Sequence, residues 1–154
     1  MDVVIAVDNS EECVKAVDFA LKHFQKGYTY HLIHVQPRPV SDTRLTSDAD
    51  SSMSVHVQHT LKKDQDAASK DFLERVFVPR ASSGGAKVKA TMLPADSDSS
   101  TSIGQTICQY VHQAKPDVLI LMKQNKTAVT RFFMGSVTRY CATECDAPVI
   151  IVPP

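Results

Sequence analysis

The sequence DVVIAVDNSEE, at residues 2–12, joins a short β-rich run to the start of a helix. Residues 3–7 are apolar and mostly β-branched, as expected of a buried strand. Asn9 and Ser10 can cap the helix that follows, with two glutamates in its first turn. Apolar residues then recur at helical spacing across residues 14–24. The stretch therefore predicts a strand–helix unit of the kind that builds parallel sheets.

The same alternation continues along the chain. We expect further strands at residues 30–35, 86–93, 117–122 and 148–152, and further helices at residues 55–78, from about 103, and at 135–145. Polar stretches at 41–54 and 95–102 are interpreted as loops. The pattern predicts one α/β domain over residues 1–154. Its open parallel five-stranded sheet should have the flavodoxin-like order 3-2-1-4-5, with four helices divided between both faces.

Composition narrows the range of partners. The chain has 154 residues, of which 43% are hydrophobic and 22% charged, and its 17 basic side chains balance its 17 acidic ones. A binder of nucleic acid or of anionic membranes normally carries a basic excess, so we expect neither partner. The apolar runs are too short to cross a bilayer, and the first residues show no signal-peptide pattern. We expect a cytoplasmic protein.

The four cysteines form no C-x-x-C pair, and three of them fall on apolar helix faces. They are Cys13, Cys108, Cys141 and Cys145. In a reducing compartment they are interpreted as small buried hydrophobic side chains. An alternative is a metal site in which Cys141 and Cys145 meet Cys108 and His112, since each pair is four residues apart. Soft-metal sites usually show tighter ligand spacing, so we expect no metal.

A candidate site follows from the predicted sheet. Open parallel sheets bind ligands at the carboxyl ends of strands where the winding reverses, here between the first and fourth strands. Asp8 directly follows the first strand, and the loop 123–134 follows the fourth. The next helix then begins with Gly135, Ser136, Val137 and Thr138. Its free backbone N–H groups and two hydroxyls suit an anion, although a capped helix after a glycine turn explains the pattern equally well.

Several of these stretches resemble the universal stress protein family. The sequence AVDNSEE at residues 6–12 is similar to the family's first strand and turn, and His34-Val35 to the end of its second strand. Residues 117–152, with GSVTRYC and APVIIV, resemble its fourth strand, loop, helix and last strand. Residues 38–102 share only the order of strand and helix. The resemblance implies a stress-response domain, and some members of the family bind ATP or AMP.

The loop after the fourth strand departs from the family. Nucleotide-binding members read G-x-x-G, nine residues, then G-S or G-T. This chain keeps Gly135 and Ser136, but Met122 and Asn125 stand at the two earlier glycine positions. Glycine serves where backbone passes close to phosphate or takes positive φ. Asn125 tolerates the left-handed conformation, whereas Met122 should crowd the approach, so we expect nucleotide binding to be weak or lost.

The resemblance implies roles for further residues. Ala6, Asp8 and Val35 are expected to line the adenosine pocket. Lys123 and Lys126, in a loop without acidic residues, are candidate phosphate contacts.

The resemblance also implies a homodimer. Residues 147–152, APVIIV, would form an apolar edge strand, and such an edge invites pairing unless it is covered. Family members commonly pair through this strand, so we expect a homodimer through residues 148–152.

No catalytic set is visible in the sequence, since it contains no nucleophile motif, no G-K-S/T loop and no metal motif. The favoured hypothesis is a stress-response binding or signalling module that is not an enzyme and whose protein partner is unknown. The alternative is an ATP- or AMP-binding protein, with slow ATPase activity.

Overall fold

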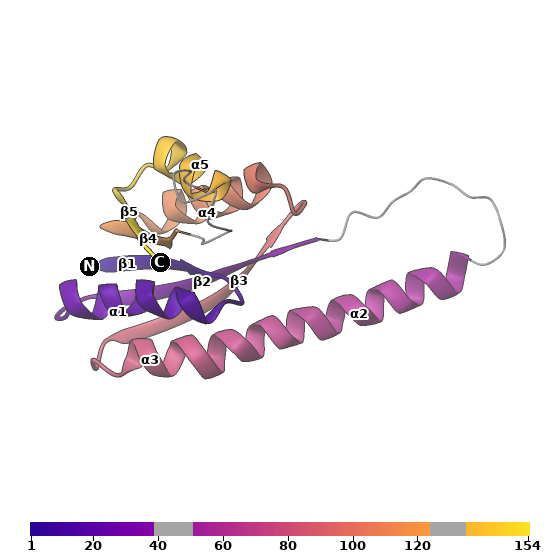
Figure 1. The fold of residues 1–154 in the computed structure, drawn as a ribbon, viewed down its shortest axis with the longest axis horizontal. Coiled ribbons are helices and arrows are strands. Elements are labelled where there is room, and N and C mark those ends of the chain that lie inside the picture. Colours follow the sequence, from indigo (N-terminus) through magenta and orange to yellow (C-terminus); the bar gives the residue numbers. More distant parts are fainter. Residues whose placement is uncertain (39–50, 124–134) are drawn as a thin grey trace.

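The computed structural model of this chain describes residues 1–38, 51–123 and 135–154, with the backbone alone for residues 51–59. The strands are β1 (Asp2–Val7), β2 (Thr29–Pro37), β3 (Lys87–Ala95), β4 (Val118–Met122) and β5 (Val149–Val152). They form one parallel sheet in the order β3-β2-β1-β4-β5, which confirms the predicted topology (Figure 1).

The helices of the described part cover both faces of this sheet. They are α1 (Val14–His23), α2 (Ser51–Phe72), α3 (Val78–Ser82), α4 (Ser100–Ala114) and α5 (Ser136–Glu144). A π-helical turn, Leu73–Phe77, joins α2 to α3, so that these two helices run on as one. Pro79, the second residue of α3, has no N–H to offer the carbonyl of Arg75 within this turn. The α1 and α2–α3 segments lie on one face, and α4 and α5 on the other (Figure 1).

Element boundaries differ from the predictions where pairing or capping decides them. β2 and β3 each extend two residues past the predicted end, because the two strands pair as far as Pro37 and Ala95. Neither polar stretch is all loop, since α2 already begins at Ser51 and α4 at Ser100. Ser99 caps this helix, and its hydroxyl accepts a hydrogen bond from the N–H of Ser102 at 3.1 Å.

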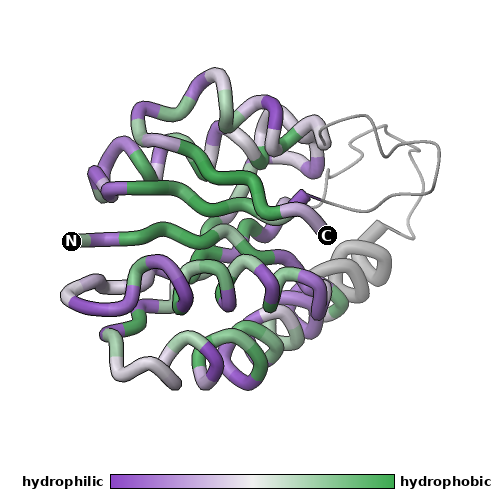
Figure 2. The backbone as a smooth tube through the Cα atoms, turned by 60° about the vertical axis from the view of Figure 1, so that its left-hand side comes forward, coloured by the Kyte–Doolittle hydropathy of each residue, from purple (hydrophilic) through white to green (hydrophobic). Residues whose placement is uncertain are grey.

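Two apolar clusters hold the layers together. On the α1 side, Val3, Ile5 and Val7 of β1 pack with residues of α1 and α3. On the other side, Val4 packs with residues of β4 and α4. The central strands are therefore apolar along their length (Figure 2), as expected of a parallel sheet buried on both faces. No helix in the described part is both long and apolar enough to cross a membrane.

The contact between α4 and α5 is unusually close at Gly104. This glycine is buried, and a Cβ atom added to it would lie 2.5 Å from Cδ1 and 2.8 Å from Cγ of Tyr140. Within the ring of Tyr140, these atoms are the ones closest to the backbone of that residue. They therefore cannot move aside unless α5 itself shifts. Gly104 therefore sets how closely the two helices approach.

We predict that Gly104→Ala destabilises the protein although alanine is the better helix former. Alanine gains about 1 kcal/mol of helix propensity, but overpacking a closed contact costs about 1–3 kcal/mol. Urea unfolding should therefore show a net loss of up to about 2 kcal/mol. Gln105→Ala, at an exposed position on the same helix, is the control and should change stability by less than about 0.5 kcal/mol. Equal stability of the two variants would show that α4 and α5 can move apart slightly at no cost in stability.

Candidate functional site

A cavity of about 390 Å³ lies at the carboxyl ends of β1 and β4. It gathers predicted site residues from four separate stretches of the chain, namely Ala6, Asp8, Val35, Met122, Gly135, Ser136, Val137 and Thr138. Asp8 and Gly135, which are far apart in the sequence, thus share one site at the point where the sheet reverses its winding direction.

The remaining predicted residues are not brought to this cavity. Lys123 follows β4 directly, and its backbone N–H donates to the carbonyl of Val152 at 2.8 Å, but it does not line the cavity. Asn125 and Lys126 lie outside the described residues.

Asp8 organises the turn at the end of β1. Its Oδ1 accepts hydrogen bonds from the N–H of Ser10 at 2.8 Å and from the thiol of Cys13 at 3.2 Å. The cap predicted for Asn9 and Ser10 is therefore wrong. Ser10 makes no side-chain capping bond, and the Asn9 amide instead donates to Ser69 at 2.9 Å. The bond from Asp8 to the N–H two residues further on is an Asx turn, which closes the end of β1.

Cys13 lines the cavity beside Asp8. Burial raises the pKa of its thiol to about 11, so the thiol remains protonated near neutral pH. A protonated thiol can donate to Asp8, but it is a poor nucleophile.

Met122 contributes to the cavity wall from the core. Its side chain is 6% exposed and packs in the cluster on the α1 side of the sheet. The neighbouring Leu121 faces the α4–α5 side, as alternation along a strand requires. Because α5 packs on that side, Met122 lines the cavity from the opposite, α1 face of the sheet.

Sequence reasoning missed half of the cavity lining. The additional residues are Val7, Cys13, Ile33, Asp98, Ser100, Ile103, Ile107 and Leu121. Asp98 and Ser100 come from the stretch interpreted as a loop, which reaches the cavity because the chain crosses from β3 over the sheet into α4. The hydroxyls of Ser100 and Ser136 lie 2.6 Å apart, so they connect the starts of α4 and α5 at the cavity rim.

The cavity wall combines N–H groups that suit an anion with carboxylates that repel one. The start of α5 offers backbone N–H groups to an anion, because its N-cap is Gly135, which has no side chain to accept from them. The Thr138 hydroxyl already donates to the Gly135 carbonyl at 2.6 Å. Asp8 and Asp98 place two carboxylates in the wall, and no lysine or arginine is found among the lining residues that the structure describes.

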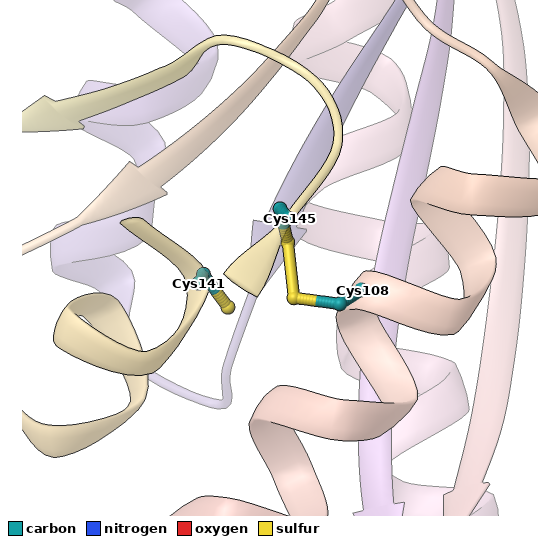
Figure 3. A group of neighbouring side chains, drawn as sticks. All are labelled: Cys108, Cys141 and Cys145. Carbon is teal, nitrogen blue, oxygen red and sulfur yellow. A yellow bond between two sulfur atoms is a disulfide. The ribbon is translucent and has the colours of Figure 1, made fainter. Parts of the chain in front are cut away.

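A second feature is the cysteine cluster, formed by Cys108 on α4, Cys141 on α5 and Cys145 just after α5 (Figure 3). Cys108 and Cys145 form a disulfide with their Cα atoms 4.9 Å apart, so their prediction as reduced side chains is wrong. The close packing of α4 and α5 brings residues 37 positions apart within disulfide range. Cys13 and Cys141 are free and buried, as predicted.

The fold and the cavity define an α/β domain of the doubly wound type with a cavity at its switch point. The sequence profile of the Universal stress protein family matches residues 1–153. The chain belongs to this family. A search of curated proteins finds no match.

Solved structures agree on the fold. Universal stress protein UspA from Lactobacillus plantarum is 19% identical, with a TM-score of 0.69 over 99% of this chain and 97% of its own. A universal stress protein family protein from Arabidopsis thaliana, solved with AMP bound, is 18% identical, with a TM-score of 0.60 over 99% and 91%. The universal stress protein from Archaeoglobus fulgidus in complex with dAMP is 18% identical, with a TM-score of 0.61 over 98% and 96%.

Proposed function

We propose that this chain is a stress-response binding or signalling module without catalytic turnover, whose cavity binds adenine nucleotides weakly and prefers a monophosphate to a triphosphate. The observation that carries the proposal is the charge of the cavity wall. Asp8 and Asp98 both contribute carboxylates, and no cationic side chain is found among the described lining residues. Each additional phosphate on a ligand adds negative charge that these two carboxylates repel.

The rest of the cavity suits a nucleoside. Its volume of about 390 Å³ falls in the usual range of small-molecule sites. Ala6, Ile33, Val35 and Leu121 give it an apolar wall against which a base can pack. The start of α5, with the Ser136 hydroxyl, can hold one phosphate. Two solved relatives hold AMP and dAMP, which supports this class of ligand.

The absence of turnover rests on the groups in the cavity wall. The thiol of Cys13 is protonated and donates to Asp8. The Ser100 and Ser136 hydroxyls bond to each other, and the described lining contains no histidine or lysine to act as a base. The alternative, an ATP-binding protein with slow ATPase activity, is favoured only by the retained Gly135–Thr138 helix start.

We predict that Asp98→Asn strengthens nucleotide binding. The substitution keeps the size of the side chain and removes its charge. A like-charge repulsion of about 1 kcal/mol near a protein surface corresponds to about fivefold in affinity. Calorimetry at low salt should therefore show AMP binding about three- to tenfold tighter, with a larger gain for ATP.

Asp96→Asn is the matched control. The Asp96 carboxylate lies two residues away and is 95% exposed, and it does not line the cavity. This variant should bind AMP and ATP like the unmodified protein. Tight ATP binding by the unmodified protein, unchanged by Asp98→Asn, would contradict the proposed function.

We also propose that the chain forms a homodimer through β5. This strand pairs with β4 on one side only and lies at the edge of the sheet. Val149, Ile150 and Ile151 are each only partly buried. An uncharged apolar edge is a template for pairing, and a second copy related by a two-fold axis would place Ile150 near its own counterpart.

Ile150→Lys should convert the dimer into a monomer, because the interface would then bury two like charges close together. Light scattering at tens of micromolar measures the change, with the unmodified protein giving twice the mass of the chain. Leu61→Lys, which alters a 58% exposed apolar side chain on α2, is the control and should remain dimeric. A monomeric unmodified protein, or dissociation by Leu61→Lys alone, would refute pairing through β5.

A further inference from the structure

We propose that the cysteine cluster binds a zinc ion when its disulfide is reduced, with Cys108, Cys141 and Cys145 as thiolate ligands and water in the fourth position. The observation that carries this proposal is the convergence of three sulfurs from two helices. The Sγ atoms of Cys108, Cys141 and Cys145 all lie within 4.8 Å of one another. Figure 3 shows the Cys141 side chain directed toward the disulfide.

The spacing of the sulfurs suits one tetrahedral ion. With Zn–S bonds of about 2.3 Å, two thiolates on the same zinc lie about 3.8 Å apart. The three sulfurs therefore need only small side-chain adjustments, and the two helices stay where Gly104 and Tyr140 hold them. The backbone is thus already arranged for the site before any metal binds.

The burial of the cluster indicates where the ion would sit. Cys141 is fully buried within the apolar cluster on this side of the sheet, while Cys108 and Cys145 are half-buried. Three sulfurs with no hard oxygen ligand among them favour a soft or borderline metal over Mg²⁺ or Ca²⁺. The half-buried side opens to solvent, where water can complete the coordination.

Charge favours a divalent ion such as zinc over Cu⁺. Three thiolates around Zn²⁺ leave a net charge of −1, whereas the same ligands around Cu⁺ leave −2. The lower charge is less costly beside an apolar core. His112 is not part of the group, since its Nδ1 lies 2.5 Å from Oδ2 of Asp146 at the surface.

The disulfide and the metal exclude each other. The sulfurs of a disulfide carry no thiolate charge, and zinc takes thiolates as its sulfur ligands. A dithiol reductant would supply two electrons and two protons to Cys108 and Cys145 and become a disulfide itself. Zinc would then displace the protons of the three thiols into solvent.

Cobalt(II) substitution tests the site, because Co²⁺ in a tetrahedral thiolate site absorbs strongly and Zn²⁺ then displaces it. The full chain is reduced with a dithiol and desalted without oxygen, and a second sample is kept oxidised. We expect the reduced protein to bind one Co²⁺ with sulfur-to-metal charge-transfer and tetrahedral ligand-field bands, both of which zinc abolishes. The oxidised sample, identical in sequence, should show neither band.

Two variants locate the ligands. Mutating residues that only hold metal ligands in place already lowers metal affinity ten- to hundredfold. Removing a ligand itself, as in Cys108→Ala, should therefore lower the affinity for Co²⁺ by about a hundredfold or more. Cys108 is half-buried, which limits the damage to the fold, and circular dichroism checks it. Cys13→Ala, which removes the other free buried thiol, is the control and should bind like the unmodified protein. The proposal is overturned if the reduced protein shows no bands, if the oxidised protein binds equally, or if Cys13→Ala loses as much affinity as Cys108→Ala.

Discussion

The pairing of β1 with β4 is the constraint on which the rest of the structure depends. Residues Val3 to Ala6 pair in register with Val118 to Leu121, and both strands are buried on both faces. From β1 the chain winds outward in one direction through β2 and β3, and then returns to add β4 and β5 on the other side. The connections after β1 and β4 therefore lead to opposite faces of the sheet. The space that they leave at the carboxyl edge is the cavity that holds Asp8 and Gly135.

The packing of α4 on α5 connects this cavity to the cysteine cluster. Three contacts follow one another along the helix pair. Ser100 meets Ser136 at the cavity rim, Gly104 packs against the ring of Tyr140, and Cys108 reaches Cys145. On α4 the three residues recur at every fourth position, which is the spacing of one helix face. Their partners are Ser136 and Tyr140 on α5 and Cys145 just after it. A change in the redox or metal state of the cluster would therefore act on the same helix pair that supplies Ser100 and Gly135 to the cavity.

The sequence predicted what local signals determine. Strand and helix periodicity gave the sheet order, and the strand ends placed Asp8 and the start of α5 at one site.

Asp98 and Ser100 were not predicted as site residues, because only the path of the crossover from β3 brings them over the sheet. The disulfide between Cys108 and Cys145 was not predicted, because it depends on how closely two helices approach, which a buried glycine decides. The helix after β1 has no side-chain cap from Asn9 or Ser10, and Asp8 instead binds the N–H of Ser10 in the turn before it. The glycine pattern of the family's loop drew attention to Met122, but its burial in the α1-side cluster follows from strand alternation and not from the motif.

Mass spectrometry of the small molecules released from the purified, denatured protein tests most directly whether the cavity has lost tight triphosphate binding. An apolar site with two carboxylates in its wall should release no ATP in stoichiometric amount, and AMP, if present, at well under one molecule per chain. ATP recovered at close to one molecule per chain would contradict a weakly binding cavity and would make the protein a tight ATP binder.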